Sequence, residues 1–328
     1  MIKQVRKFIT IAAVSYFAAS VPAVHAAEDT IRLGLQSVPT DVLYQAKDWA
    51  KPYELKTEIS TFSSAGDSLK AFLAGRVDVV SGGAARLVSM AAMQPEKFYI
   101  VATNQYGGGR YGLMVAPTSP YKNIQDLKGK KIGVVGGSGS YGTFIMYLEK
   151  NKLGPKDFQL VNMKVEDIAA AVSRGVVDAG LAWEPQVAIA EVSNMVKRIA
   201  SMEGISDSPN FILASRNYAD AHPESLAKYI ASLIDIAQLI ETNSKEAGSL
   251  VSKQLEKSGV DIKPEAMALA FGRVTVDPKI EIRLLDELPP IAESMLSNGR
   301  IKAVPDFKVL VNTGFYDKAV ALQKTANR

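Results

Sequence analysis

Short apolar runs alternate along the chain with longer segments in which apolar residues recur every three or four positions. The runs at residues 31–35, 77–81 and 98–103 are rich in Val, Ile and Leu, which is typical of buried strands. The segments at residues 41–50 and 84–93 have the apolar spacing of amphipathic helices. This alternation predicts an α/β protein whose sheets are mostly parallel and are flanked by helices.

One helix-to-strand unit occurs twice in the sequence. Residues 67–78 (DSLKAFLAGRVD) and 167–178 (DIAAAVSRGVVD) both run from an Asp through a helix to a Gly and then to Val-Asp, with the same spacing. The strand and loop before the first copy (residues 31–37) likewise correspond to those before the second (residues 132–138). Chance similarity is the alternative explanation. We expect two lobes built to one plan.

The predicted lobes are discontinuous in sequence. Two apolar connections, at residues 111–115 and 211–215, are expected to cross between them. The first lobe then comprises residues 27–115 and 216–328, and the second comprises residues 116–215. The C-terminal sequence is mostly helical and has no partner strands of its own, so its helices are expected to pack on the first lobe.

Loops at the carboxyl ends of parallel strands lie at one edge of a sheet, where proteins of this class bind ligands. In the first lobe this rule places Ser37, Ser64 and Gly83 at a predicted cleft between the lobes. In the second lobe it places residues 138–140 and Trp183 there. The cleft is therefore expected to be lined from both lobes.

A Gly- and Ser-rich turn in the second lobe carries the main chemical signal. The turn, residues 136–140 (GGSGS), joins a short buried strand to a helix and contains no acidic side chain. Its glycines allow close approach of the backbone, and its serines supply hydroxyls. Unpaired N–H groups at a helix N-terminus favour an anion. The predicted ligand contacts in this turn are Gly137, Ser138, Ser140 and Tyr141.

Two other interpretations of this turn were weighed. A tight strand-to-helix turn needs glycine for purely structural reasons. Residues 137–142 (GSGSYG) also fit the dinucleotide-binding pattern, but that pattern requires an acidic residue at the end of the next strand, where Asn162 and Met163 stand. A Walker-type phosphate loop would have Gly-Lys before Thr143, and this sequence has Tyr-Gly. The nucleotide interpretation is therefore disfavoured.

Two further side chains are candidates for ligand contact. Arg110 follows three glycines and is suited to a bidentate contact with a carboxylate or sulfonate, although a surface position is the alternative. Trp183, at a predicted strand end, is suited to stacking on an apolar part of a ligand, and a core position is the alternative. Glu184 is better explained as an acid in the first turn of the next helix than as a ligand contact.

The first 26 residues have the form of a secretory signal peptide. A basic start precedes an apolar stretch, and residues 24–26 (VHA) form a small-residue cleavage site, so Ala27 is the expected mature start. An uncleaved anchor fits less well, because the apolar run is short and interrupted. Cleavage would remove three basic and no acidic residues and lower the formal charge from +4 to +1, which does not indicate binding to nucleic acid.

The chain has no cysteine and two histidines. A lipid anchor at the cleavage site would require a cysteine, so none is expected, and Cys/His metal sites and catalytic triads are disfavoured. His222, the histidine that remains after cleavage, precedes Pro223 at a predicted helix start and is assigned no chemical role. No metal or cofactor is expected.

Several stretches, taken in order, resemble the nitrate/sulfonate/taurine family of substrate-binding proteins for ABC importers. They are residues 73–78 (LAGRVD), 126–133 (DLKGKKIG), 182–185 (AWEP), 212–216 (ILASR) and 221–223 (AHP). The resemblance covers essentially the whole mature chain. It implies a type II periplasmic-binding-protein fold in which two hinged lobes close on a small ligand, with residues 137–141 receiving an anionic group. The segment at residues 49–53 departs from the family, so the apolar end of the pocket is expected to differ.

We therefore expect a monomeric, periplasmic substrate-binding protein that captures a small organic anion and delivers it to membrane permease subunits. The rival interpretation is an enzyme on the same fold, which would need a convergent acid/base or nucleophilic group in the cleft. An exported partner of a membrane sensor is a third interpretation that the sequence does not separate from the first. The identity of the anion is open among sulfonate, sulfate ester, nitrate and carboxylate.

Overall fold

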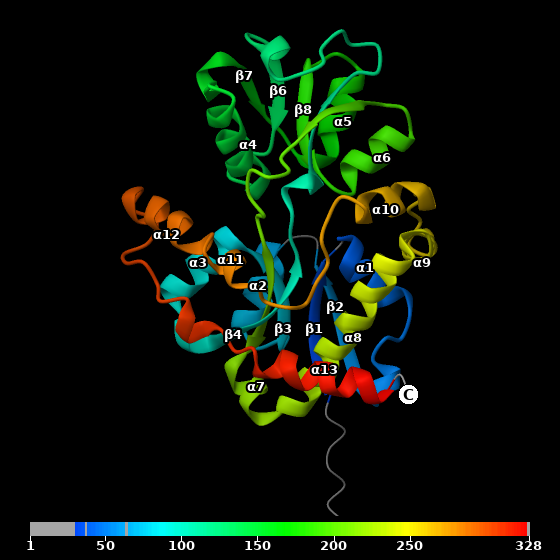
Figure 1. Ribbon diagram of the computed structural model, residues 1–328, viewed down its shortest axis with the longest axis vertical. Coiled ribbons are helices and arrows are strands. Elements are labelled where there is room, and N and C mark those ends of the chain that lie inside the picture. The colour runs from blue at the N-terminus through cyan, green and yellow to red at the C-terminus, as the bar shows by residue number, and fades with distance from the viewer. Residues whose placement is uncertain (1–29, 37, 63–64, 327–328) are drawn as a thin grey trace, which may run out of the picture.

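The computed structural model describes residues 30–36, 38–62 and 65–326, which form two lobes, each built around a five-stranded sheet (Figure 1). The predicted signal peptide, Ser37 and Ser64 lie outside the described residues, so these three assignments stay predictions. In the described part of the chain, no helix is long and apolar enough to cross a membrane.

The first sheet has the strand order β2-β1-β3-β10-β4. Strand β1 is parallel to β2 and β3, whereas β10 runs antiparallel to both β3 and β4. The carboxyl ends of β1, β3 and β4 therefore share one edge of the sheet. The strands are β1 (Thr30–Gln36), β2 (Lys56–Phe62), β3 (Val79–Gly83), β4 (Phe98–Gln105) and β10 (Asn210–Ser215).

The second sheet repeats this arrangement, with the strand order β7-β6-β8-β5-β9. Strand β6 is parallel to β7 and β8, and β5 occupies the antiparallel position that β10 has in the first sheet. The prediction of two lobes built to one plan is confirmed. The strands are β5 (Tyr111–Val115), β6 (Lys131–Val134), β7 (Gln159–Asn162), β8 (Ala179–Trp183) and β9 (Lys197–Ser201).

The repeated Val-Asp step has the same structural role in both lobes. The Asp78 carboxylate accepts the N–H of Arg32 at 2.9 Å, and Asp78 donates its own N–H to the Arg32 carbonyl at 2.7 Å. Asp178 makes the same pair of contacts with Lys131, at 3.0 Å and 2.9 Å. Each aspartate thus ties the start of one strand to its parallel neighbour.

The predicted crossing strands belong to the opposite sheets from those expected. Residues 111–115 were assigned to the first lobe, but β5 pairs with β8 and β9 in the second sheet. Strand β10, assigned to the second lobe, pairs with β3 and β4 in the first. Each apolar run becomes a central strand of the lobe it enters, because its side chains are buried there. The connections between the sheets are residues 106–110 and 202–209.

Helices cover both faces of the first sheet (Figure 1). One face packs against α1, α8, α9, α10 and α13, and the other against α2, α3, α11 and α12. The C-terminal helices thus pack on the first lobe, as predicted. These helices and α7 are α1 (Pro39–Ala46), α2 (Ala65–Leu73), α3 (Ala84–Met93), α7 (Arg216–Ala221), α8 (Pro223–Thr242), α9 (Ser244–Glu256), α10 (Pro264–Phe271), α11 (Ile282–Leu285), α12 (Leu288–Ser297) and α13 (Gly314–Ala326).

The second sheet is covered by α4 (Gly139–Lys150) on one face and by α5 (Val165–Ser173) and α6 (Gln186–Val192) on the other. Helix α6 also reaches the first lobe, because Ala188 joins the apolar cluster that contains Met267 of α10. The two lobes therefore touch along α6 and α10 (Figure 1).

The segment at residues 49–53 packs in the core of the first lobe. Trp49 is 6% exposed, and its Nε1 donates to the Leu43 carbonyl at 2.9 Å. The hydroxyl of Tyr53 lies 2.7 Å from Asp235 Oδ2 on α8. Because this segment precedes β2, it lies at the edge of the sheet opposite the carboxyl ends of the parallel strands. The segment therefore does not line the end of the sheet where the pocket is expected, and a different apolar end of the pocket stays a prediction.

Candidate functional site

The predicted Gly- and Ser-rich turn forms the N-terminus of α4. Gly137 has φ +73°, in the left-handed region that favours glycine. Ser138 is the N-cap residue, and its Oγ accepts the N–H of Tyr141 at 3.1 Å. The first turn of α4 carries no acidic side chain. The positive end of the helix is therefore not neutralised by a residue of its own.

Both serine hydroxyls are already engaged within the turn. Ser138 Oγ donates to the Val135 carbonyl at 2.7 Å, so Ser140 is the donor in its 2.8 Å contact with Ser138. The N–H groups of Gly139 and Ser140, by contrast, have no acceptor in the part of the chain that the structure describes. This turn therefore offers an anion two backbone N–H groups rather than the predicted serine hydroxyls.

Arg110, at the end of the first connection between the lobes, is buried and only partly paired. The residue is 6% exposed, and its Nη2 donates to Tyr111 Oη at 2.8 Å and to the Ser208 carbonyl at 2.5 Å. Its Nε and Nη1 are buried and have no hydrogen-bond partner among the described residues. A buried cation with unpaired donors is unfavourable unless an anion completes it. The surface interpretation of Arg110 is wrong.

Tyr111 and Ser208, which the sequence analysis did not assign to the site, connect Arg110 to the α4 turn. Tyr111 Oη and Ser208 Oγ are 2.8 Å apart. A Cβ built on Gly139 would lie 3.1 Å from the Tyr111 hydroxyl and 3.2 Å from the Ser208 hydroxyl. This pair of hydroxyls thus adjoins both the guanidinium group and the start of α4. Arg110, Tyr111, Ser208 and the start of α4 form one cluster, the Arg110 cluster.

The two connections between the lobes lie against each other beside the Arg110 cluster. Gly107 donates its N–H to the Asp207 carbonyl at 2.7 Å. A Cβ on Gly108 would lie 2.1 Å from the Met202 carbonyl oxygen, so no larger residue fits there. The cluster therefore rests on paired connections that both lobes share.

Gly83 lies next to the second connection. A Cβ on Gly83 would lie 3.0 Å from Asn210 Oδ1, and Ala84 donates its N–H to the Pro209 carbonyl at 3.2 Å. The structure therefore links three predicted positions, Gly83, Arg110 and the α4 turn, through the segment that contains Ser208.

Trp183 ends β8 directly opposite Tyr111 in the antiparallel pair. Side chains at directly opposed positions lie on the same face of a sheet, so the two rings share one face. Trp183 is half-buried and, like Tyr141, packs against the apolar cluster that includes Tyr111. Trp183 therefore belongs partly to the apolar core of the second lobe and partly to the surroundings of the Arg110 cluster.

Glu184 forms a buried network with Arg273, which follows α10. Glu184 Oε2 accepts the Ala188 N–H at 2.9 Å, and Oε1 accepts from Arg273 Nη1 at 2.8 Å. Arg273 Nη1 also pairs with Glu191 at 2.5 Å. Burial raises the pKa of Glu184, and the nearby Arg273 opposes that rise. Glu184 precedes Pro185, the N-cap residue of α6, so the prediction that it lies in the first turn is wrong, although its carboxylate accepts an N–H at that helix start. The Arg273 pair ties the second lobe to the C-terminal part of the chain.

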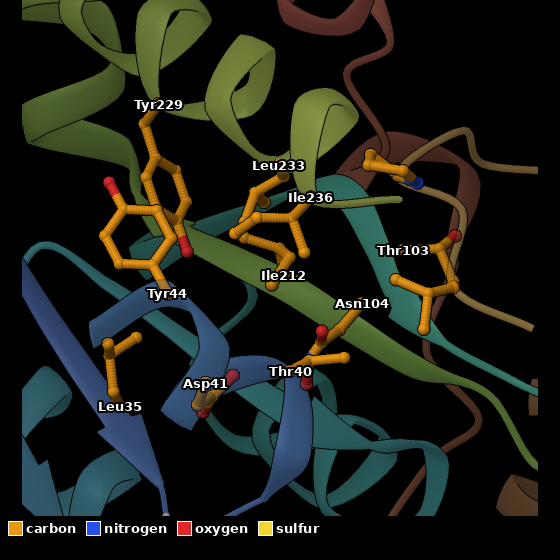
Figure 2. A pocket seen from close by; sticks show the side chains of 12 residues that line it. Leu35, Thr40, Asp41, Tyr44, Thr103, Asn104, Ile212, Tyr229, Leu233 and Ile236 are labelled. Carbon is orange, nitrogen blue, oxygen red and sulfur yellow. The ribbon is translucent and has the colours of Figure 1, made fainter. Parts of the chain in front are cut away.

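A small cavity lies in the first lobe between the sheet, α1 and α8 (Figure 2). Its volume of about 10 Å³ has room for one water molecule and not for an organic anion. Asp41 lies on its wall, 6% exposed, and burial raises the pKa of this carboxyl group to about 7. Because no residue of the Arg110 cluster lines this cavity, the two places are separate.

Comparison with known proteins places more than half of the chain in one family. Residues 42–246 match the family described as NMT1/THI5 like. A protein of Bacillus subtilis (strain 168) that is named, provisionally, as an aliphatic sulfonates-binding protein is 24% identical over 239 residues, which cover 70% of this chain and 72% of that protein.

Solved structures with the same fold include both a binding protein and an enzyme. The alkanesulfonate-binding protein SsuA from Xanthomonas axonopodis pv. citri, bound to MOPS, has a TM-score of 0.70 at 21% identity, covering 88% of this chain and 100% of that chain. The desulfurization enzyme DSZB has a TM-score of 0.67 at 15% identity, covering 89% and 99%. The predicted two-lobed periplasmic-binding-protein fold is confirmed, and the fold alone does not exclude catalysis.

Proposed function

The chain belongs to the NMT1/THI5-like family, and from this premise we propose that it is the periplasmic substrate-binding protein of an ABC importer. It captures a small organic anion, such as a sulfonate, sulfate ester or carboxylate, between its lobes and delivers it to membrane permease subunits. Export to the periplasm and action as a monomer belong to the same proposal. The sulfonate-binding names of the relatives support it.

The observation that carries the proposal is the half-paired guanidinium group of Arg110. Its Nε and Nη1 are buried without a partner among the described residues, and either can donate to an oxygen of an anionic group. The Tyr111 and Ser208 hydroxyls adjoin Arg110 and also lie beside Gly139, where α4 begins with free N–H groups. An anion in this place would satisfy a buried cation and a helix end together.

The aromatic side chains beside the cluster favour an anion with an apolar body. Tyr111 and Trp183 share one face of the second sheet, and Trp183 is half-buried. Such a ring provides apolar contact area for an organic substituent. This arrangement supports an organic anion over nitrate.

Three side chains that could act as an acid or a base, Glu184, Glu191 and His222, support binding rather than catalysis. Glu184 and Glu191 are engaged by Arg273. His222 stacks on Tyr218 at a centroid distance of 4.8 Å, just before α8 begins, at the edge of the first sheet opposite the carboxyl ends of its parallel strands. These groups are not arranged as a convergent acid/base pair at the cluster.

A ligand screen tests this function directly. The melting temperature of the purified protein is measured with ethanesulfonate, nitrate, acetate, benzoate and the cation choline. Because a ligand that binds the folded state raises the melting temperature, an organic anion is expected to raise it in the native protein and not in Arg110→Met. Arg174→Met, which removes an exposed arginine of the second lobe, should keep the response. A rise with choline and with none of the anions would overturn the proposal.

A further inference from the structure

Glu287, the residue before α12, reaches across to the second connection between the lobes. Its carboxylate accepts three hydrogen bonds, from Ser206 Oγ at 2.7 Å, from the N–H of Asp207 at 2.6 Å and from the N–H of Ser208 at 3.0 Å. All three donors are neutral groups on consecutive residues. Hydrogen bonds to an ionised carboxylate are stronger than neutral ones, so one side chain fixes three successive residues.

The backbone that Glu287 fixes has an uncommon conformation. Ser208 has φ +44°, in the left-handed region that residues other than glycine adopt at an energetic cost. The Ser208 N–H is held both by Glu287 and by Ser206 Oγ, at 3.0 Å each. These two contacts offset the energetic cost of the left-handed conformation, because the Ser208 N–H is hydrogen-bonded in that conformation.

The conformation of Ser208 determines where two groups of the candidate site lie. The Ser208 carbonyl accepts from Arg110 Nη2, and its Oγ contacts Tyr111 Oη. A change of φ at Ser208 would therefore move the acceptor that orients the guanidinium group and the hydroxyl beside Gly139. Glu287 is connected to the Arg110 donors through this one residue.

We infer that Glu287 is a positioning residue for the anion site, which holds Ser208 so that Arg110 keeps an unpaired donor directed toward the ligand. This inference rests on the proposed function and assigns no ligand contact to Glu287 itself. It couples the C-terminal helices, which pack on the first lobe, to the affinity of a site beside α4 in the second.

A neighbouring ion pair does not replace this contact. Arg283 pairs with Asp207 and with Glu281, and its side chain is 51% exposed. Ion pairs this exposed contribute little to stability because solvent screens them. Only Glu287 accepts the N–H groups of both Asp207 and Ser208 among the described residues. Substitution of Glu287 is therefore the informative change.

The test compares Glu287→Gln with Glu293→Gln, which makes the same change at an exposed position of α12. The first readout needs no ligand. In protein labelled with ¹⁵N-arginine, the Nε–H resonance of Arg110 is identified by its absence in Arg110→Lys. Glu287→Gln is expected to shift this resonance, since the acceptor of Nη2 moves, and Glu293→Gln is expected to leave it unchanged. Glu287→Ala is measured as a second variant that removes the carboxylate. The melting temperatures of all variants show whether each sample is folded.

The second readout is the affinity for ethanesulfonate by calorimetry. Glu287→Gln is expected to weaken binding about tenfold, and to add little in an Arg110→Met background, because residues that act through one group are not additive. If Glu287→Gln lowers only the melting temperature and changes neither the resonance nor the affinity, the positioning role is overturned. If the native protein binds none of the anions while the resonance still moves, the proposed function fails and the link from Glu287 to Arg110 stands.

Discussion

The helices that follow the first strand of each lobe, α1 and α4, start at equivalent places in the repeated plan and are completed differently. In α1, the N-cap residue Val38 makes no side-chain cap, and the third helical residue, Asp41, is a buried acid that accepts the Gln36 N–H at 2.8 Å. In α4, Ser138 caps the helix, and the third helical residue is Tyr141. One helix start carries its own carboxyl group, and the other does not.

This difference explains why a repeated fold need not give a repeated site. Both sheets place a helix N-terminus at the carboxyl end of a central strand, although Pro39, the first residue of α1, has no N–H to donate. Asp41 lies at that helix start in the first lobe. In the second lobe, the Gly139 and Ser140 N–H groups stay free and Arg110 stays half-paired. A ligand anion is therefore expected beside α4 and not beside α1.

The largest expected effect concerns the acid at α1. Burial raises the pKa of Asp41 from 3.8 to about 7, so between these pH values the folded protein holds a proton that the unfolded chain has released. The free energy of unfolding should therefore fall as pH rises through this window and level off above it. Relative to Asp41→Asn, the native protein should lose on the order of 3 kcal/mol between pH 5 and pH 8.

Urea unfolding of both proteins at several pH values measures this difference, and other carboxyl groups cancel because both proteins contain them. Equal pH dependence in the two proteins would show that the pKa of Asp41 is not raised in the folded protein. The proposed difference between the starts of α1 and α4 would then lack its evidence from α1.

A second prediction transfers the acid from one helix to the other. Tyr141→Asp places a carboxylate at the third position of α4, where α1 has Asp41. Like charges brought together at a binding site cost several kcal/mol, so ethanesulfonate affinity should fall about 100-fold relative to Tyr141→Asn, which removes the same ring without adding charge. Calorimetry on the two variants gives the ratio. Equal affinities would mean that no anion binds at this helix end.

A third prediction concerns the space between α4 and the hydroxyls. In Gly139→Ala, the added Cβ would lie 3.1 Å from Tyr111 Oη and 3.2 Å from Ser208 Oγ, so these hydroxyls must shift by a few tenths of an ångström. We expect ethanesulfonate binding to weaken about fivefold. Gly142→Ala is the matched control, because its Cβ would meet no atom within 4 Å, and the same calorimetric titration should show native affinity. A weaker Gly142→Ala would point to a general effect on the helix.

The smallest expected effect is at the cap of α4. Ser138→Ala removes the acceptor of the Tyr141 N–H and should lower the free energy of unfolding by about 1 kcal/mol. Ligand affinity should change less than tenfold, because the Ser138 hydroxyl donates to Val135 and not outward. Urea unfolding and calorimetry on one sample separate the two effects. A large loss of affinity with unchanged stability would assign Ser138 a direct ligand contact.

The sequence was sufficient for those features that depend on local pattern. The duplicated Val-Asp step predicted two lobes built to one plan, and the GGSGS turn predicted a helix start without an acid. The sheet to which residues 111–115 belong was predicted wrongly, because an apolar run shows that a strand is buried but not which neighbours it has. Tyr111, Ser208 and Glu287 were missed for a related reason, since each reaches the site through contacts between residues far apart in the chain.

The most direct test of the account is a crystal structure of the protein with ethanesulfonate. We expect sulfonate oxygens within hydrogen-bond distance of the Gly139 and Ser140 N–H groups and of Arg110 Nε or Nη1, with the ethyl group toward Trp183. A sulfonate bound beside α1, or at any place that leaves Arg110 and the start of α4 without an anion, would contradict it.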